Sequence, residues 1–344
     1  MELRGPDIEQ DKKMAAMQQE GANVGRLRSR ELWRIVGNEL SQIKEYGATP
    51  RARRSTKESL EDADPPEIIA TKAYRNADFL NSEQARHIRI LCEYEETKQR
   101  LESVPVSATV MFFGSARSKD HATHARLVNE AQTIAAGTPG SEEVKEAEQA
   151  LVRLASIEWM CDYMDKIREL SRRVTSWSVD RATKSTCGAV DQALPVYVCT
   201  GGGPGFMEAA NRGAVDVEGG KSIGMGITLP FEAGLNPYVS PELAFEFHYF
   251  FTRKFWMSFH MKALVVAPGG MGTLDELFEL LTLKQTGKIQ NSFPVVLFGK
   301  AFWEGCINWQ TLKEFGVCSP SDVDNLFFTD DVDEAFQFIV SALE

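Results

Sequence analysis

The feature that most constrains the fold is an alternation of short apolar runs with helical patterns, in which several of the runs end in glycine. The runs cover residues 106–116, 195–203, 221–230, 262–270 and 294–299. Short apolar runs rich in β-branched residues are typical of strands that are buried on both faces. Because helical patterns separate the runs, the sequence predicts a parallel sheet covered by helices on both sides. We therefore expect an α/β protein with a Rossmann-like, doubly wound parallel sheet.

The length of the chain leaves room for more than this sheet, since 344 residues suffice for one enlarged domain or for two. We expect the α/β domain to span residues 105–344, with a helical insertion at about 137–190. Residues 71–104 have a helical pattern with Ser82 as a helix N-cap, and form a helical lead-in to the domain.

The first 70 residues are predicted to form a polar extension, partly helical or disordered. Apolar residues recur at helical spacing over 30–46, which predicts a helix there, and 48–67 has the composition of a linker. The basic run at 51–54 favours a solvated linker, with a targeting or docking signal as the alternative.

Charge and composition argue against several classes of function. The formal net charge of −11 argues against a protein that coats nucleic acid or an anionic membrane, because cations are not in surplus. No apolar stretch is long enough to span a bilayer. The six cysteines form no CxxC pair, so neither a disulfide framework nor a zinc site is indicated.

His121 and His124 are interpreted as solvated helix residues, so no metal and no cofactor are expected. Acidic residues near the amino terminus favour a cytoplasmic protein.

Three predicted strands end in small or glycine-rich loops: FGSARS (113–118), TGGGPGFMEAAN (200–211) and PGGMGTLDELFELLT (268–282). Ligands of doubly wound sheets bind at the carboxyl ends of the strands. In the third loop, glycines let the backbone approach a ligand, and a helix beginning at Thr273 supplies unpaired N–H groups and a positive dipole end. This loop is predicted to bind a phosphate monoester, with Arg253 and Lys254 as nearby cations.

The same loops allow other interpretations. A P-loop is disfavoured because its Gly-Lys-Ser/Thr ending is absent, and a dinucleotide loop is disfavoured because Phe206 occupies the place of its third glycine. A mononucleotide or a sugar phosphate fits better. Thr273 and Glu276 also match a capping box, in which case they would only start a helix.

Residues 268–276, PGGMGTLDE, match the PGGxGTxxE motif of the LONELY GUY (LOG) family, and TRK (252–254) stands where that family has an Arg-Lys pair. FFGSARS, CTGGGPGFMEAANRGA and SIGMGITLPFE resemble three further blocks of the family. The resemblance covers residues 105–300, and AYRNADFLNSEQARHIRILCEYEE with MCDYMDKIRELSRRVTSW resembles the longer, bacterial-type branch. Proteins of this kind often carry the label "lysine decarboxylase-like", which no residue here supports as chemistry.

The resemblance implies a phosphoribohydrolase that forms a homodimer or a higher homo-oligomer. Such enzymes cleave the N-glycosidic bond of nucleoside 5′-monophosphates, either cytokinin riboside monophosphates or AMP, and release the free base and ribose 5-phosphate. By motif, Arg253 and Glu276 would be the catalytic pair. Loop and helix residues would bind the substrate, namely Gly270, Met271, Gly272, Thr273, Lys254, Glu232, Thr282, Glu279, Gly114, Ser115, Gly202 and Gly203. Glu232 depends on aligning LPFE with the family's MPRE, where Phe231 replaces an arginine.

Two alternative functions are a broad-specificity purine and pyrimidine nucleotide nucleosidase in salvage, and a non-catalytic nucleotide-binding regulator, which the retention of Arg253 and Glu276 disfavours. Ser115 and Arg117 are either substrate contacts or a helix cap and a surface charge. Asn211 and Arg212 are expected to hold a helix and a loop together. One aromatic set is expected mostly in the core or a subunit interface: Phe245, Phe247, Tyr249, Phe250, Phe251, Phe255 and Trp256.

Overall fold

The computed structural model describes residues 70–104, 106–185, 195–228, 234–289 and 293–344. The chain divides into two units, Met1–Ala70 and Thr71–Glu344, and the second contains nearly all of the described residues. The expected helix over 30–46, the expected linker over 48–67 and the candidate Glu232 lie outside the described residues.

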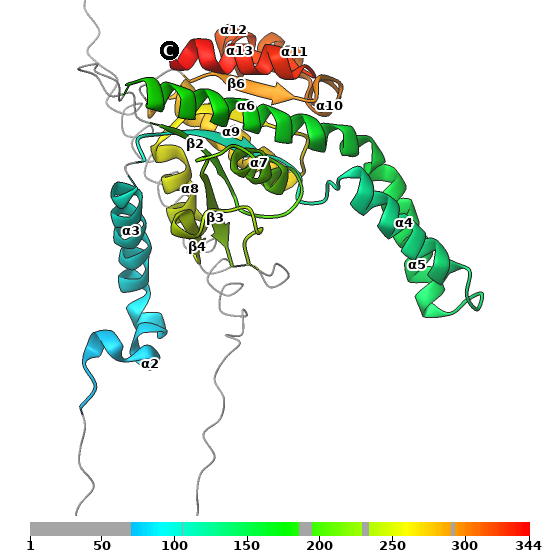
Figure 1. Ribbon diagram of the computed structural model, residues 1–344, viewed down its shortest axis with the longest axis horizontal. Coiled ribbons are helices and arrows are strands. Elements are labelled where there is room, and N and C mark those ends of the chain that lie inside the picture. The colour runs from blue at the N-terminus through cyan, green and yellow to red at the C-terminus, as the bar shows by residue number, and fades with distance from the viewer. Residues whose placement is uncertain (1–69, 105, 186–194, 229–233, 290–292) are drawn as a thin grey trace, which may run out of the picture. The chain divides into compact units, whose positions relative to one another are not determined.

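Seven parallel strands form one sheet in the order β4-β3-β2-β1-β5-β6-β7 (Figure 1). They are β1 (Ala108–Phe113), β2 (Val196–Thr200), β3 (Ser222–Ile227), β4 (Ala244–Phe247), β5 (Met261–Val266), β6 (Val295–Phe298) and β7 (Leu326–Thr329). From β1 the chain moves outward to β4, returns to place β5 beside β1, and moves outward in the other direction. The predicted α/β class and doubly wound parallel sheet are therefore confirmed.

Helices connect the strands. The α-helices are α2 (Ala77–Leu80), α3 (Arg86–Ser103), α4 (His121–Ala135), α5 (Glu142–Ile157), α6 (Cys161–Ser185), α7 (Phe206–Val215), α8 (Phe250–Phe259), α9 (Met271–Gln285), α10 (Lys300–Cys306), α11 (Trp309–Glu314), α12 (Pro320–Asp324) and α13 (Val332–Leu343). Short 3₁₀ turns are η1 (Ala73–Arg75), η2 (Glu83–Ala85), η3 (Glu158–Met160) and η4 (Pro241–Leu243). No helix in the described ranges combines the length and the apolar character that a membrane span requires.

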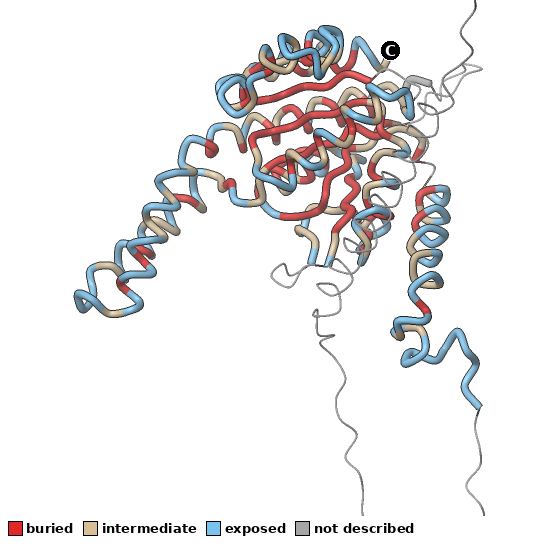
Figure 2. Tube along the Cα trace, turned by 180° about the vertical axis from the view of Figure 1, so that it is seen from behind, coloured by how far each residue is buried: buried red, intermediate tan, exposed pale blue. Residues whose placement is uncertain are grey.

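Alternate residues of the central strands enter two separate cores. In β1, Val110 and Phe112 pack with α6, α7 and α13, whereas Met111 and Phe113 pack with α8, α9 and α10. The inner strands β1, β2, β3, β5 and β6 are buried over most of their length, as the red tube in Figure 2 shows. Because both of their faces are covered, these five strands read as apolar runs, which is why most of the sheet is visible in the sequence.

Some elements differ from the sequence-based expectations. The edge strand β7 has only four residues and lies between helices, so no clear apolar run in the sequence indicates a strand there. Ser82 precedes η2 rather than the long helix α3, which begins at Arg86. The break before α3 is stabilised by Arg89, whose guanidinium donates to the carbonyl oxygens of Leu80 and Ser82 at 2.6 Å each.

The region expected as a helical insertion has two parts. α5 packs mainly against α4, which precedes this region, and much of the surface of both helices is exposed in Figure 2. α6 instead packs on α7 and contributes Ile167, Leu170 and Val174 to the core. α6 is therefore an integral layer of the α/β unit.

Candidate active site

The strand order reverses between β1 and β5, which are neighbours in the sheet. In doubly wound sheets, the crevice outside the carboxyl ends of such a pair is the usual place for a ligand. Backbone hydrogen bonds join the loops that follow these two strands. The Ala267 N–H donates to the Phe113 carbonyl at 2.8 Å, and the Ser115 N–H donates to the Pro268 carbonyl at 2.9 Å. The first and third predicted loops therefore lie side by side at the reversal point.

The glycine-rich loop after β2 joins the same crevice. At the start of α7, the Phe206 N–H donates to the Ser115 carbonyl at 3.2 Å. Gly205 has a φ of 73°, and a Cβ at this position would lie 2.4 Å from the Ser115 carbonyl oxygen. Only glycine allows this approach. All three loops thus meet beyond the carboxyl ends of β2, β1 and β5.

Helix α9 begins two residues earlier than the sequence predicts. Its first residue is Met271, and its N-cap is Gly270. Thr273 is buried in the first turn with its side chain against Gly269, and Glu276 accepts a hydrogen bond from Arg253 rather than returning to the helix start. The capping-box interpretation is therefore wrong, because the end of β5 sets the helix start and glycine serves as N-cap.

At the start of α9, the space beside the backbone is free of other atoms. A Cβ at Gly270 or at Gly272 would meet no atom within 4 Å, and Met271 is 85% exposed. No side chain of the N-cap residue satisfies the first N–H groups. The orphan N–H groups of this helix, with the positive end of its dipole, are therefore accessible to an anion.

Arg253 and Glu276 form a buried ion pair one turn and a half into α9. The Arg253 Nη1 donates to the Glu276 Oε1 at 3.1 Å, and its Nε donates to the Met225 carbonyl at the end of β3 at 2.8 Å. The Arg253 side chain is 9% exposed and the Glu276 side chain is 15% exposed, so the pair is largely shielded from solvent. The guanidinium also lies against Gly201, where a Cβ would approach Nη2 to 2.4 Å. A strand (β3), a helix (α9) and the loop after β2 therefore fix the position of Arg253.

The electrostatics of Glu276 follow from its burial. Burial raises the pKa of the Glu276 carboxyl above its ordinary value, and the charges of Arg253 and Lys254 oppose this effect without cancelling it. Burial thus destabilises the charged form of the Glu276 carboxyl, and the two cations stabilise it. Such a group is suited to stabilising positive charge that develops nearby.

Lys254 has partners of its own. Its Nζ contacts the Asp275 carboxylate at 2.7 Å and the Glu279 carboxylate at 2.5 Å. Burial lowers the pKa of Lys254, but the hydrogen bonds to Asp275 and Glu279 outweigh this effect, so its pKa lies above the ordinary value. Lys254 is therefore charged and held on the first two turns of α9 beside Glu276.

A buried polar network holds the loop after β2. Asn236 donates to the carbonyls of Gly202 and Gly203 at 3.0 Å each and to Asn211 Oδ1 at 2.8 Å. Asn211 also accepts from the Thr200 hydroxyl at 2.7 Å. The expectation that Asn211 holds helix and loop together is confirmed. Gly202 and Gly203 are buried, and their carbonyls are used within the protein.

The other candidate residues lie at several places around the crevice. Gly114 is buried and tightly packed, since a Cβ there would lie 2.8 Å from the Phe206 Cβ. Ser115 accepts a hydrogen bond from the Arg117 N–H at 3.1 Å, and the Arg117 side chain is exposed. Thr282 is exposed and donates to the Phe278 carbonyl at 2.7 Å, away from the Arg253–Glu276 pair. Their roles toward a substrate stay predictions.

Sequence reasoning missed several supporting residues. The Met225 carbonyl carries no side-chain signal, and Asn236 lies far from the glycines it holds. Asp275 is visible as an acidic residue of the motif segment, but its pairing with Lys254 requires the packing of α8 on α9. Spacing therefore identifies which loops converge, whereas the supporting hydrogen bonds become visible only in the fold.

The two histidines have different environments. His121 is exposed, and its Nε2 contacts Asp162 at 2.8 Å. His124 is buried, and its Nε2 lies 3.0 Å from the Leu154 carbonyl. The interpretation of His124 as a solvated residue is therefore wrong, because α5 covers that face of α4. Among the described residues, no group of His, Cys, Asp and Glu side chains is arranged to hold a metal ion.

The aromatic set divides between core and surface. Phe245, Phe247 and Trp256 are buried in the core, and Tyr249 is half-buried. Phe250, Phe251 and Phe255 are exposed on α8, the helix that carries Arg253 and Lys254.

Comparison with known proteins adds a family match. A family model described as "Possible lysine decarboxylase" matches residues 207–339. This stretch includes Arg253, Lys254 and Glu276. Over this stretch, the chain is similar to that family.

Among the curated proteins no match was found. One similar solved structure is the molybdenum cofactor binding protein from the phototrophic bacterium Rippkaea orientalis, with 14% sequence identity and a TM-score of 0.36. The alignment covers 69% of this chain and 96% of that chain.

Proposed function

We propose that this protein hydrolyses the N-glycosidic bond of nucleoside 5′-monophosphates, cytokinin riboside monophosphates or AMP, to the free base and ribose 5-phosphate. The observation that carries the proposal is the buried Arg253–Glu276 pair beside an open helix N-terminus at the reversal point of the sheet. The family match is compatible with this activity.

The phosphate is assigned to the start of α9. Its first-turn N–H groups favour an anion, and Gly270 and Gly272 leave the space beside the backbone free. Glu276 lies five residues beyond Met271, roughly 7.5 Å along the helix axis. A ligand of the size of a ribose phosphate therefore reaches both the helix start and the carboxylate.

The reaction breaks the bond between ribose C1′ and the base nitrogen, and forms a bond from C1′ to a water oxygen. Positive charge develops on the ribose as the base departs, so the Glu276 carboxylate stabilises the transition state. The same carboxylate orients the water and accepts its proton, while the base leaves with the electrons of the broken bond and takes a proton from solvent, to which Glu276 returns the proton of the attacking water. Arg253 holds the carboxylate in place with a planar fork anchored at Met225.

The direct test is to incubate the purified protein with AMP, CMP, GMP and isopentenyladenosine monophosphate, and to measure free base by chromatography. The wild type is expected to release the base together with ribose 5-phosphate. The turnover of Arg253→Ala should be lower by at least about 100-fold. Turnover of all bases would favour the salvage nucleosidase, and binding without turnover would favour the regulator. Release of inorganic phosphate in place of base would contradict the proposal.

The oligomer is proposed to form through an apolar surface on α3 and α8. Leu91 and Tyr94 of α3 are exposed beside four exposed phenylalanines of α8: Phe250, Phe251, Phe255 and Phe259. Tyr94 contacts the Phe255 ring at 5.5 Å, and Phe255 contacts Phe259 at 5.4 Å, so these three rings are continuous across the two helices. An exposed apolar patch of this kind is typical of a protein interface, and a second copy of this chain is the proposed occupant.

Sedimentation equilibrium tests this assignment. The double variant Phe251→Ser/Phe259→Ser is expected to be monomeric at concentrations where the wild type is dimeric. Phe315→Ser is the matched control, because Phe315 is 79% exposed outside this surface. A monomeric wild type, or a dimer that survives the double substitution, would refute the interface.

A further inference from the structure

Helix α8 begins without a cap from its own sequence. Its N-cap residue, Tyr249, makes no side-chain capping bond. A carboxylate from another helix lies at this end of α8. Glu93 of α3 accepts a hydrogen bond from the His248 N–H at 2.8 Å with Oε1 and from the Thr252 hydroxyl with Oε2. A negative charge at the N-terminus of a helix also interacts favourably with the helix dipole.

These contacts bear directly on the site, because Thr252 is followed by Arg253. Arg253 must reach the Met225 carbonyl and Glu276 at once, with its guanidinium against Gly201. Successive residues of a helix point about 100° apart, so a bond on Thr252 limits rotation of α8 around its axis. A small rotation would move the guanidinium out of hydrogen-bond distance of one of its two acceptors.

The helix that carries Glu93 is itself firmly held. On the same face of α3, Arg100 donates to the Ala244 carbonyl at 2.6 Å and lies 4.1 Å from the centre of the Phe245 ring. Tyr94 contacts the Trp256 ring at 5.2 Å, one turn beyond Thr252 on α8. α3 therefore connects β4 to the start of α8, and Glu93 is its polar contact nearest to Arg253.

We propose that Glu93 is a positioning residue that holds the start of α8 and thereby keeps Arg253 on Glu276. The inference rests on the proposed function for its kinetic test and on the geometry alone for its structural test. Glu93 touches no reacting atom in this assignment. It acts through Thr252 and the backbone of α8.

The kinetic test compares Glu93→Gln with Glu95→Gln, which alters an exposed glutamate on the same helix that makes no polar contact within the described residues. With AMP as substrate, kcat of Glu93→Gln is expected to fall at least tenfold with KM changed less than threefold. Arg253 lowers the pKa of Glu276. Its displacement in the variant should therefore move the acidic limb of the pH–kcat/KM profile to higher pH. Glu95→Gln should match the wild type in all three measurements.

Thr252 supplies an independent variant. Thr252→Val removes the hydroxyl and should reproduce the effect of Glu93→Gln, whereas Thr252→Ser should restore most of the lost activity. In the double variant Glu93→Gln/Thr252→Val the losses should not add fully, because both substitutions act on the contact between Glu93 and the Thr252 hydroxyl. A lower melting temperature with an unchanged kcat and pH profile would show that Glu93 only stabilises the fold, and would overturn the proposal.

A crystal structure of Glu93→Gln separates this inference from the proposed function. The distance between Arg253 Nη1 and Glu276 Oε1 is expected to exceed hydrogen-bond range in the variant, compared with 3.1 Å here. An unchanged pair would overturn the inference even if the wild type proved active. If the wild type hydrolysed no nucleotide, the proposed function would fail while this structural comparison would still decide the role of Glu93.

Discussion

At the scale of single residues, Glu276 is placed where burial opposes its charge. Its pKa is raised by burial despite Arg253 and Lys254. An acid whose pKa rises on folding stabilises the folded state while it is protonated. That contribution is present below the ordinary value of 4.5 and is lost as the pH rises through the higher folded value. At neutral pH the ionised carboxylate therefore costs folding free energy.

The first prediction follows from this conflict. Glu276→Gln should melt at a higher temperature than the wild type at pH 7.5, with a difference that shrinks toward pH 4, because the neutral amide avoids the penalty and can still accept from Arg253. Hydrolysis of AMP by the same variant should fall at least about 100-fold. Calorimetry and a base-release assay measure the two effects.

Glu148→Gln is the control for this pair of measurements, since Glu148 is exposed on α5 without a polar partner in the described chain. It should change neither quantity. Near-wild-type hydrolysis by Glu276→Gln would remove Glu276 from the proposed mechanism.

At the scale of elements, α9 has two structural features, which lie in different turns of the helix. Its first turn presents open backbone at Gly270 and Gly272, and its second turn directs carboxylates toward α8. Packing requires glycine at neither of the two open positions. In the proposed function, their lack of side chains allows a ligand to approach the backbone.

The second prediction tests that explanation. A methyl group at Gly272 enters open space, so Gly272→Ala should fold normally and gain up to about 1 kcal/mol from helix propensity. The same methyl would obstruct a phosphate at the helix start, so KM for AMP should rise about tenfold, near 1.4 kcal/mol of lost binding.

The matched substitution is Gly305→Ala in α10, where a Cβ also meets nothing within 4 Å. Its KM should equal that of the wild type. Equal KM values for both variants would argue that phosphate does not approach α9 at Gly272.

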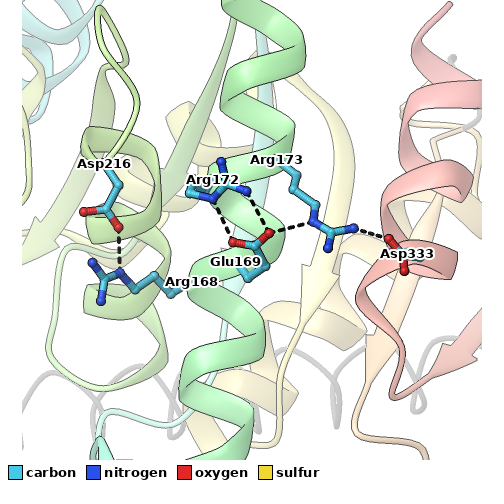
Figure 3. A network of polar contacts seen from close by, with 6 residues as sticks. All are labelled: Arg168, Glu169, Arg172, Arg173, Asp216 and Asp333. Atoms are coloured by element: carbon cyan, nitrogen blue, oxygen red, sulfur yellow. Dashed lines mark hydrogen bonds and ion pairs between the residues drawn. The ribbon is translucent and has the colours of Figure 1, made fainter.

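At the scale of the described unit, a chain of ion pairs on α6 connects elements far apart in the sequence (Figure 3). Arg168 pairs with Asp216 at the end of α7, and Arg173 bonds to Asp333 at the start of α13. Between them, Glu169 accepts from Arg172 at 2.7 and 2.8 Å and from Arg173 at 2.7 Å. The hydrogen bond from Arg172 is the largest cause that lowers the pKa of Glu169, to about 2.

The third prediction concerns acid stability. A carboxyl whose pKa falls on folding stabilises the protein above its ordinary value of 4.5, and the contribution is lost as the pH falls toward about 2. Glu169→Gln should therefore flatten the dependence of melting temperature on pH below 4.5. At pH 7 the loss should stay within about 1 kcal/mol, since the group is partly exposed and screened by solvent.

Glu130→Gln provides the comparison, because Glu130 pairs with Arg126 within α4 and bridges no other element. Melting curves of this variant should follow the wild type over the whole pH range. If the melting temperature of Glu169→Gln fell in acid as steeply as that of the wild type, the α6 network would not contribute to folding.

Much of the fold could be predicted because its signals are local. Strands buried on both faces appear as apolar runs, and glycines mark the strand ends that meet at the reversal of strand order. The four-residue strand β7 and the start of α9 were not predictable in the same way. Pairing with β6 defines the first, and the end of β5 with Gly270 as N-cap defines the second.

By itself, the sequence determined the α/β class, the loops that converge and the residue types available for chemistry, because each depends on neighbouring residues and on periodicity. Only the tertiary structure decided that Arg253 is held by Met225, Glu276 and the gap at Gly201, that Asn236 supports the loop after β2, and that Glu93 binds His248 and Thr252 at the start of α8. These contacts join residues distant in sequence through backbone carbonyls and single side chains. No periodicity encodes such pairings, because packing of whole elements brings the partners together.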